Sequence, residues 1–280
     1  MQTIRSITKM PKVSRQLAAR GKRIALVPTM GNLHEGHLSL VKRAKKTADV
    51  VIVTIFVNPK QFGPKEDYKK YPRDEKNDIA KIKKAGGDIV FIPKATQIYP
   101  DDFQTFVTVE KLSKTLEGKS RPQHFRGVTT VVAKLFNITR PDVAVFGAKD
   151  FQQAIVLKQM TKDLGYPIKF VIAPTVREKD GLAMSSRNRY FTAEQRPEAC
   201  ALYYALRTAR EMVKSGIKDV RALKSEMRAV IKATSPKAKI DYIAFTEFDS
   251  LKPVSKASKS TICSLAVWLH NVRLIDNMRL

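Results

Sequence analysis

The sequence predicts an α/β protein, with a doubly wound parallel sheet in an N-terminal domain and a smaller α+β domain after it. In the first part of the chain, apolar β-branched runs alternate with stretches of helical period. Such alternation is typical of a parallel sheet with right-handed crossovers. After about Arg187 the alternation stops, and two helical periods precede three strand-like runs. We therefore expect domains at residues 1–175 and 176–280.

The elements of the first domain follow from local patterns. Val50–Val57 is a nearly continuous β-branched run, as expected for a strand covered on both faces. Gly36–Thr47 repeats apolar residues at a helical period. The expected strands are Lys22–Pro28, Val50–Val57, Asp88–Ile92, Val143–Phe146 and Ile168–Ile172. The expected helices are Gly36–Thr47, Asp74–Ala85, Gly127–Ile138 and Asp150–Leu164.

The second domain is predicted from capping residues and apolar runs. Thr192 is suited to cap a helix that continues to about Lys214 and stops at Gly216. Asp219 is suited to start a second helix, which ends near Ala233. The strand-like runs that follow are Ile240–Phe245, Thr261–Leu269 and Val272–Ile275.

Composition narrows the class of protein. The chain has 280 residues, of which 43% are hydrophobic, so it can bury one large core or two smaller ones. No apolar run approaches the ~20 residues of a transmembrane helix, and the first residues contain no apolar signal segment. Cys200 and Cys263 are the only cysteines, too few for a disulfide framework. We expect a cytoplasmic protein without membrane partners.

The net charge of +26 has two interpretations. It arises from 52 Lys and Arg against 26 Asp and Glu, spread over both predicted domains without a basic tail. It indicates either a solvated, lysine-rich surface or attraction of anionic partners. A nucleic-acid-binding protein is an alternative that rests on this charge alone. Because aromatic residues do not alternate with the basic runs, we expect no specific nucleic-acid partner.

Two of the four histidines, His34 and His37, fall between a predicted strand and a predicted helix. Their spacing is not that of the H-E-x-x-H zinc helix, and no third ligand is evident. A metal pair and an incidental surface turn are the alternatives. The free N–H groups and positive dipole at a helix N-terminus favour phosphate. Gly31 and Gly36 would allow tight backbone conformations there.

This H-x-G-H stretch resembles the signature of the nucleotidyltransferase superfamily that includes class I aminoacyl-tRNA synthetases. The longer string PTMGNLHEGHLSLV resembles the pantothenate synthetase (pantoate–β-alanine ligase) family within it. Further segments resemble that family in the same order along nearly the whole chain: FVNPKQF, HFRGVTTVVAKLFNI, FGAKDFQQ, PTVREKDGLAMSSRNRY and RLIDN.

The resemblance implies a Rossmann-like domain and a two-step ligation. ATP adenylates the carboxylate of pantoate with release of pyrophosphate, and the amine of β-alanine then displaces AMP to give pantothenate. The substrates are ATP, pantoate and β-alanine, Mg²⁺ is the expected metal, and a homodimer is the expected assembly. An H-x-G-H nucleotidyltransferase acting on a different small acid remains an alternative.

The resemblance also implies roles for single residues. His34, His37 and Lys149 are the expected catalytic residues, with His37 as proton donor. Asn58, Gln61 and Gln153 supply neutral amides, which suit an uncharged polyol acid. Asp78 is the candidate metal ligand. The implied ATP-binding residues are Met30, Gly31, Asn32, Leu33, His34, Glu35, Gly36, His37, Gly147, Ala148, Lys149, Asp150, Val176, Met184, Ser185, Ser186 and Arg187.

Ala148, Gln123 and the stretch WLHNV depart from the family pattern. Ala148 stands where the family usually has Glu, so the role of that carboxylate is in doubt here. Gln123 replaces a usual Gly, and WLHNV precedes RLIDN where a glycine-containing stretch is usual. We expect this last difference, including His270, to affect packing more than chemistry.

Overall fold

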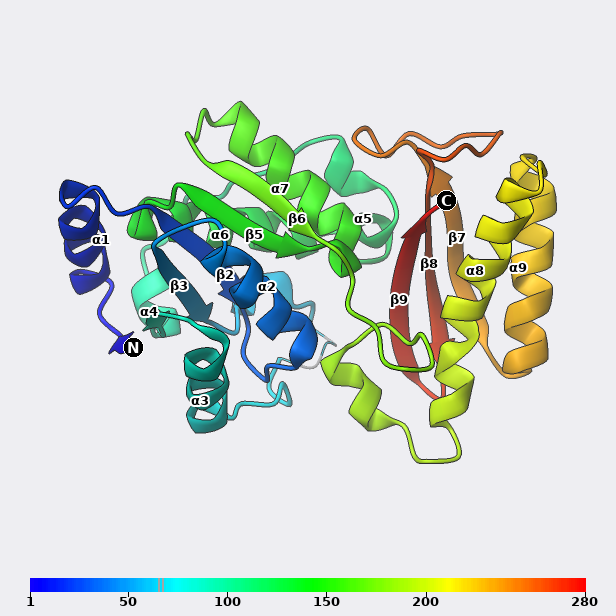
Figure 1. The fold of residues 1–280 in the computed structure, drawn as a ribbon, viewed down its shortest axis with the longest axis horizontal. Helices are drawn as coiled ribbons and strands as arrows, with labels where there is room; N and C mark the ends of the chain where they lie inside the picture. The colour runs from blue at the N-terminus through cyan, green and yellow to red at the C-terminus, as the bar shows by residue number, and fades with distance from the viewer. Residues whose placement is uncertain (65, 67) are drawn as a thin grey trace. The chain divides into compact units, whose positions relative to one another are not determined.

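A computed structural model describes residues 1–64, 66 and 68–280. Its chain divides into two compact units (Figure 1). The first unit comprises residues 1–147 and 152–174, and the second comprises residues 148–151 and 175–280. No helix among the residues so described combines the length and apolar character needed to cross a membrane.

The first unit is built on a six-stranded parallel sheet in the order β1-β4-β3-β2-β5-β6. Its strands are β1 (Gln2–Ile4), β2 (Ile24–Thr29), β3 (Val50–Ile55), β4 (Ile89–Phe91), β5 (Val143–Gly147) and β6 (Lys169–Ala173). Its helices are α1 (Lys9–Ala19), α2 (Glu35–Lys45), η1 (Pro59–Gln61), α3 (Glu75–Ala85), α4 (Ala95–Ile98), η2 (Leu112–Lys114), α5 (Glu117–Ser120), α6 (His124–Thr139) and α7 (Phe151–Asp163).

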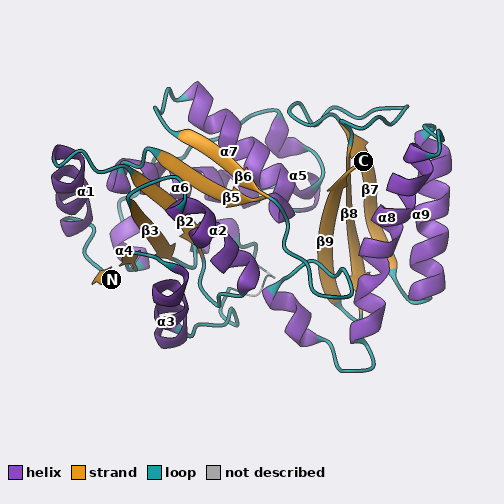
Figure 2. Ribbon diagram, viewed as in Figure 1, coloured by secondary structure: helices purple, strands orange, loops and turns teal. Residues whose placement is uncertain are grey.

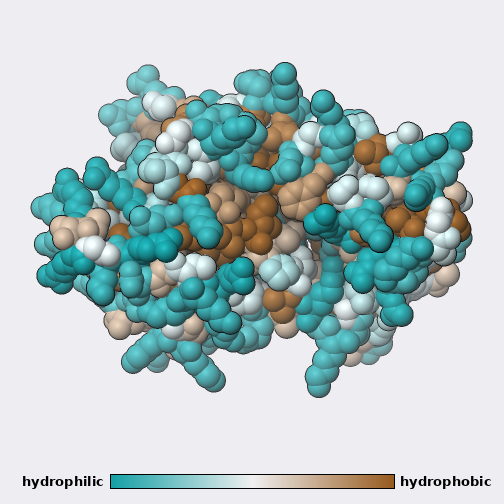
Figure 3. All heavy atoms as spheres, turned by 45° about the horizontal axis from the view of Figure 1, so that its top comes forward, coloured by the Kyte–Doolittle hydropathy of each residue, from teal (hydrophilic) through white to brown (hydrophobic). Residues whose placement is uncertain are grey.

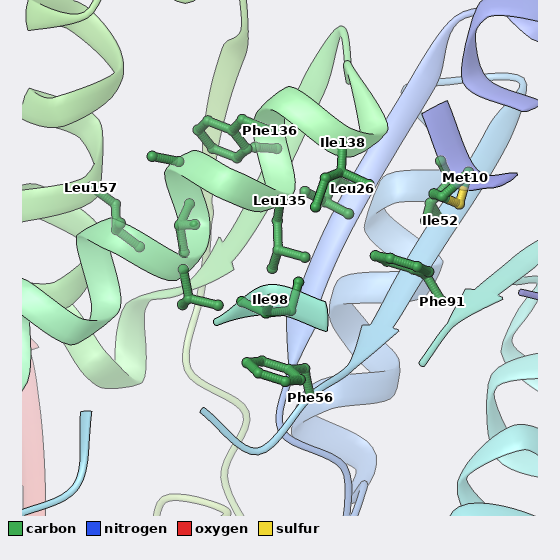
Figure 4. Close-up of a cluster of buried hydrophobic side chains, with 14 of the residues drawn as sticks. Met10, Leu26, Ile52, Phe56, Phe91, Ile98, Leu135, Phe136, Ile138 and Leu157 are labelled. Atoms are coloured by element: carbon green, nitrogen blue, oxygen red, sulfur yellow. The ribbon is translucent and has the colours of Figure 1, made fainter. Parts of the chain in front are cut away.

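Both faces of this sheet are buried, as the β-branched strands predict. Leu26 and Ile52 contribute to a core with residues of α1, α6 and α7 (Figure 4). Val27 and Val53, their neighbours in sequence, contribute to a separate core with α2 and α3. Successive side chains point to opposite faces of a strand, so each central strand fills two cores. The doubly wound prediction is confirmed.

The strand order reverses next to β2. From β2 the chain proceeds outward through β3 to β4, and β5 then pairs with the other side of β2, with Leu26 opposite Ala144. In open α/β sheets, ligands bind beyond the carboxyl ends of strands at such a reversal. Thr29 ends β2 and Gly147 ends β5, so the segments that follow these two residues are candidates for a site.

The second unit combines helices with a three-stranded antiparallel sheet, as predicted (Figure 2). Its core joins α8 and α9 to the sheet. Its elements are η3 (Ala148–Asp150), η4 (Ser186–Tyr190), η5 (Arg196–Cys200), α8 (Ala201–Lys214), α9 (Val220–Thr234), β7 (Lys239–Thr246), β8 (Ile262–Leu269) and β9 (Val272–Arg279).

Two details of the predicted elements are wrong. The helix expected to start at Thr192 begins at Ala201, and Thr192 caps only a local turn in which its hydroxyl accepts the N–H of Gln195. Pro197 lies in the intervening 3-10 segment η5, where its missing N–H disfavours a continuous α-helix. The helix predicted from Gly127 begins three residues earlier, at His124.

The turn between β8 and β9 accommodates the unusual sequence before RLIDN. His270 and Asn271 both have positive φ, 45° and 67°, the conformation that two-residue hairpin turns require and that glycine or asparagine usually supplies. Nε2 of His270 lies 3.1 Å from Oε2 of Glu198. This difference from the family pattern therefore falls in a turn.

Hydrophilic side chains cover most of the visible surface in Figure 3. Many of the charged pairs are exposed, such as Lys114 with Glu110 and Lys214 with Glu211. Exposed pairs contribute little to stability, about 0–1 kcal/mol each. This distribution matches a solvated, lysine-rich surface.

Candidate active site

His34 and His37 lie at the turn between β2 and α2, as the sequence predicted. His34 is the N-cap residue of α2, and its backbone N–H donates to Nδ1 of His37 at 3.4 Å. The centroids of the two rings are 4.0 Å apart. A neutral imidazole whose Nδ1 accepts carries its proton on Nε2. The fold therefore leaves Nε2–H as the donor of a neutral His37.

The backbone before His34 requires glycine at one position. Gly31 has φ of +82°, and Asn32 follows with φ of 52°. A Cβ atom on Gly31 would lie 2.9 Å from Oδ2 of Asp78 and 3.0 Å from Cγ2 of Ile55. The N–H of Gly31 donates to the hydroxyl of Thr29 at 3.2 Å. Conformation and space both exclude a side chain there.

Helix α3 holds this loop through two side chains. Oδ2 and Oδ1 of Asp78 accept the backbone N–H groups of Asn32 and Leu33, each at 2.7 Å. One turn further along the helix, Nζ of Lys81 donates to the carbonyl of Leu33 at 2.7 Å. Asp78 is buried. Asp78 and Lys81 thus fix two N–H groups and one carbonyl group of the loop backbone.

Asn58 follows β3 and is buried, with its amide engaged on every side. Its Nδ2 donates to Oε1 of Gln61 and to the carbonyl of Gly127, each at 3.0 Å. Its Oδ1 accepts the N–H of Lys60 at 3.3 Å and the hydroxyl of Tyr99 at 2.8 Å. Burial raises the pKa of Tyr99, so its hydroxyl stays protonated and donates. Asn58 therefore orients Gln61 rather than presenting a free amide.

Gln61 is joined to the histidine loop. Its Nε2 lies 3.1 Å from Sδ of Met30, which precedes Gly31. A thioether is a weak acceptor, so this amide keeps donor capacity for a better one. With Oε1 fixed by Asn58, Gln61 presents an N–H group in a defined orientation beside the loop.

Gly127 permits close packing of α6 on η1, the short helix that carries Gln61. A Cβ atom on Gly127 would lie 2.2 Å from the carbonyl oxygen of Lys60 and 2.6 Å from the backbone nitrogen of Gln61. No side chain fits there. The contact with the backbone of α6 therefore fixes the position of the Gln61 backbone.

A polar cluster that the sequence analysis did not assign lies on the other side of Gln61. Nδ1 of His124 is 2.9 Å from the carbonyl oxygen of Gln61, and the guanidinium of Arg121 also donates to that oxygen at 3.3 Å. Arg121 forms a two-point contact with Glu66. Burial, and then the charge of Arg121, lowers the pKa of His124 to about 4. His124 is therefore neutral at physiological pH, with Nδ1–H donating to the carbonyl.

Adjacent glutamines of α7 have different environments. Gln152 is buried, and its amide bonds to the carbonyls of Leu112 and Thr115 and to the N–H of Glu117. Gln153, the predicted substrate residue, is partly exposed. Gln152 thus has a structural role, whereas Gln153 is partly accessible to a ligand.

The remaining predicted residues lie in the second unit or at its start. Nζ of Lys149 is 3.8 Å from Oδ1 of Asp150, and both belong to η3, directly after Gly147. The N–H of Met184 donates to the carbonyl of Val176 at 3.0 Å, which closes a hairpin. The next residues are Ser185, whose hydroxyl accepts the N–H of Arg187 at 3.3 Å, and Ser186.

The predicted residues therefore form separate groups. Within the first unit, the structure brings the Met30–His37 loop together with Gln61 and Asp78. Glu35 of this loop is directed along α2, with its carboxylate 3.5 Å from Nζ of Lys42, and Gly36 lies in the first turn of that helix. Within the second unit, Lys149 and Asp150 lie on η3, and Met184–Arg187 follows a hairpin.

Asp78 is poorly suited to bind a metal. Both of its oxygens accept backbone N–H groups, which fixes the carboxylate on the loop. Among the residues that the structure describes, no three His, Cys, Asp or Glu side chains are grouped so that they could hold a metal ion. The geometry favours a loop-supporting role for Asp78 over a ligand role.

Several contributors to the site were not recognised from the sequence. Tyr99, Arg121 and His124 surround Asn58 and Gln61, and Lys81 contacts the loop. His124 occurs in HFRGVTT, one of the segments that carry the resemblance, and this was the available signal. Tyr99 and Lys81 gave no comparable signal.

Comparisons with known proteins show the family to which the sequence is similar. A family model described as pantoate-beta-alanine ligase matches residues 2–279. A pantothenate synthetase of Moorella thermoacetica is 50% identical over 278 residues, which cover 99% of this chain and 97% of that protein. One from Syntrophotalea carbinolica is 52% identical, with 94% of each chain covered.

Solved structures extend the agreement to the fold. Pantothenate synthetase from Thermus thermophilus has a TM-score of 0.94 at 41% identity, covering 100% of this chain and 99% of its own. Pantoate-beta-alanine ligase from Francisella tularensis, a complex with Beta-gamma ATP and β-alanine, has a TM-score of 0.78 at 34% identity. That alignment covers 100% of this chain and 97% of the other. The chain belongs to the pantoate–β-alanine ligase family.

Proposed function

We propose that this pantoate–β-alanine ligase works through a pantoyl-adenylate. A carboxylate oxygen of pantoate attacks the α-phosphorus of ATP, the bond to the bridging oxygen breaks, and pyrophosphate leaves. The amine of β-alanine then attacks the acyl carbon, loses a proton, and displaces AMP. Membership of the family supports the ligation, and the Francisella relative, which is complexed with Beta-gamma ATP and β-alanine, supports the choice of nucleotide.

In the first step, negative charge builds up on the departing pyrophosphate. His37 meets this charge with Nε2–H, while its Nδ1 stays bonded to the N–H of His34. His34 lies beside it at the N-terminus of α2, where free N–H groups favour anions. His37 acts as a hydrogen-bond donor through Nε2–H, because its Nδ1 accepts the N–H of His34.

Cations and hydroxyl groups supply the remaining charge stabilisation. Lys149, on η3, neutralises phosphate charge as a point charge. Ser185 and Ser186 donate hydroxyl hydrogens, and Arg187 binds phosphate oxygens with two N–H groups. Val176 lines the adenine. Little covalent chemistry is required of these side chains, because the reaction depends on positioning and charge stabilisation.

Pantoate binds through neutral amides. Gln61 donates from Nε2 to an oxygen of the acid, since its other contact on that side is the weak acceptor Sδ of Met30. Gln153 provides the second amide. Asn58 acts one step back, by fixing Oε1 of Gln61. Amides discriminate by hydrogen bonding without adding a charge to a site that already contains phosphates.

Magnesium belongs to this proposal as a partner of ATP. It would neutralise phosphate charge, with ligands mostly from phosphate oxygens and water. The donor set around Asp78 does not fit a protein-held ion, so this chain's residues are assigned no step through the metal.

The observation that carries the proposal is the contact from the His34 N–H to Nδ1 of His37, at the turn where the strand order reverses. The test omits each substrate in turn from an assay containing ATP, pantoate, β-alanine and Mg²⁺. AMP should form only in the complete mixture. Exchange of labelled pyrophosphate into ATP should need pantoate but not β-alanine. Exchange that requires β-alanine would contradict the adenylate.

The role of His37 has its own test. His37→Ala should lower kcat by about 10²–10³-fold, the loss typical when one hydrogen-bond donor to a developing negative charge is removed. The free energy of unfolding should change little. His270→Ala, a matched histidine in the β8–β9 turn, should leave kcat within about twofold of the unsubstituted enzyme. An unchanged kcat for His37→Ala would contradict this role.

The assembly and location belong to the same proposal. We expect a homodimer, which light scattering of the purified protein would test. A reducing compartment such as the cytoplasm suits the chain, because Cys200 and Cys263 are both buried free thiols.

A further inference from the structure

Two neighbouring residues of β9, Asp276 and Asn277, contact two segments that lie far away in the sequence. Both side chains are buried, with relative exposures of 3% and 8%. They end the RLIDN stretch, which carried the resemblance but has no role in the chemistry proposed above. Side chains at successive strand positions point to opposite faces. Two adjacent residues can therefore hold two different segments.

Asn277 holds the turn that carries Lys149. Its Nδ2 donates to the carbonyl oxygens of Ala148 and Lys149, each at 2.8 Å. These contacts use side-chain donors on backbone acceptors, so they fix the position of the Lys149 backbone without engaging its ammonium group. They also do not depend on the side chain at position 148, where alanine replaces the glutamate usual in the family.

Asp276 holds the hairpin that leads into Ser185. Its Oδ2 and Oδ1 accept from the two terminal nitrogens of Arg177, at 2.6 and 3.0 Å. Arg177 also donates to the carbonyls of Gly181 and Asn277. Its guanidinium lies 5.0 Å from the ring centroid of Tyr203.

The hairpin transmits this restraint over a short distance. Arg177 pairs with Ala183 in an antiparallel bridge, and the N–H of Glu178 donates to the carbonyl of Leu182 at 2.8 Å. Gly181 closes the turn with φ of +94°, and a Cβ atom there would lie 2.0 Å from the ring of Tyr203. Only one residue separates Ala183 from Ser185, so the anchored strand leads directly into the Ser185–Arg187 segment.

We propose that Asp276 and Asn277 are positioning residues that set the spacing between Lys149 and the Ser185–Arg187 segment. This inference rests on the proposed ATP-binding role of those two segments. Neither aspartate nor asparagine touches a reacting atom. Each acts through the segment that it holds. Because the two residues are adjacent in β9, they determine together how the cation on η3 and the donors after the hairpin are arranged for one triphosphate.

A double-mutant cycle tests whether Asn277 positions Lys149. Asn277→Asp has nearly the same shape but replaces both donors with acceptors that face two carbonyls. It should lower kcat/KM for ATP by about tenfold to a hundredfold, as small misplacements of a catalytic group do. KM for β-alanine should stay within about twofold. In a Lys149→Ala background the same substitution should have little further effect, because its effect passes through Lys149.

The control is Arg273→Gln, in the same strand. Arg273 bonds to Asp241 of β7, in the same antiparallel sheet. It should alter thermal stability but not kcat/KM for ATP. Asn277→Ala, which places no acceptor against the carbonyls, serves as a milder variant should Asn277→Asp not fold.

The outcomes separate this inference from the proposed function. If Lys149→Ala leaves kcat/KM for ATP unchanged, the proposed role of Lys149 is wrong, and the positioning role of Asn277 is overturned with it. If Lys149→Ala is impaired but folded Asn277 variants are not, the positioning role alone is overturned. Equal losses from Asn277→Asp with and without Lys149 would also overturn it. The same cycle with Asp276→Asn and Arg187→Ala tests whether Asp276 positions the Ser185–Arg187 segment.

Discussion

Two buried aspartates support the proposed ATP-binding segments in different ways. Asp78 of α3 accepts two backbone N–H groups of the Met30–His37 loop directly. Asp276 of β9 acts through the guanidinium of Arg177, which in turn holds a hairpin. The first restraint fixes backbone atoms and depends on acceptor geometry. The second restraint also depends on charge, because removal of the carboxylate leaves a cation without its main partner.

Replacing each aspartate by asparagine should lower the free energy of unfolding by different amounts, and the loss at Asp276 should be the largest of all the substitutions considered. Asp276→Asn should lower the free energy of unfolding by about 2–4 kcal/mol, because a largely buried Arg177 loses its counter-charge. Asp78→Asn should cost about 1–2 kcal/mol, because one of two hydrogen bonds to a carboxylate is lost. Denaturant unfolding of both variants measures the difference.

Activity assays of the same pair add a test of the metal. For Asp78→Asn, we expect a loss of kcat/KM for ATP with an unchanged dependence on Mg²⁺ concentration. If Asp78 were a magnesium ligand, the Mg²⁺ concentration for half-maximal rate should rise markedly instead. A larger stability loss in Asp78→Asn than in Asp276→Asn would contradict the distinction between the two aspartates.

Gly31→Ala tests how closely the loop backbone must approach Asp78. The substitution combines an unfavourable positive φ with a contact of 2.9 Å to Oδ2 of Asp78. We expect a loss of about 2–3 kcal/mol in stability, together with a lower kcat/KM for ATP. Gly21→Ala is the matched control, since Gly21 has φ of +68° and no atom within 4 Å of its Cβ position. It should cost only about 1 kcal/mol. Equal losses would show that crowding against Asp78 is unimportant.

The smallest expected effect at neutral pH concerns His124, which donates to the carbonyl of Gln61. Its pKa of about 4 in the folded protein lies below the ordinary value of about 6.5. Between these values the unfolded chain binds the proton more readily, so stability falls as the pH drops from about 6.5 to about 4. Over this whole window the His124 contribution to the fall should be about 3 kcal/mol. His124→Gln should flatten the pH dependence of unfolding in this window, and an unchanged profile would contradict the assignment.

The alternating α/β pattern predicted most of the fold, and the omissions have local causes. The strand β1 has three residues and buries only Ile4 against the core. Helix α1 contains Pro11 and begins without a side-chain cap, so its sequence carries weak helical signals. In both elements, contacts with distant residues stabilise what the local sequence does not specify.

The site was predictable to the extent that its residues follow strand ends. His34 and His37 were found in this way, whereas Asn58 and Gln61 were assigned through the family resemblance. Their exact contacts were not predictable, because Asn58 bonds to Gly127, 69 positions away, and Asn32 bonds to Asp78, 46 positions away. Such partners are chosen by the packing of whole elements. Asp78, the predicted metal ligand, is an example. The sequence shows its carboxylate but not the two backbone N–H groups that donate hydrogen bonds to it.

The close packing at Gly127 has a consequence for engineering substrate range. Because the backbone of α6 lies directly against Lys60 and Gln61, no side chain at position 127 can fit without displacing η1 and, with it, the proposed pantoate contact Gln61. Variants meant to accept a longer or bulkier hydroxy acid should therefore be sought at Met30 and Gln153. Libraries that randomise position 127 should return almost exclusively glycine among active clones.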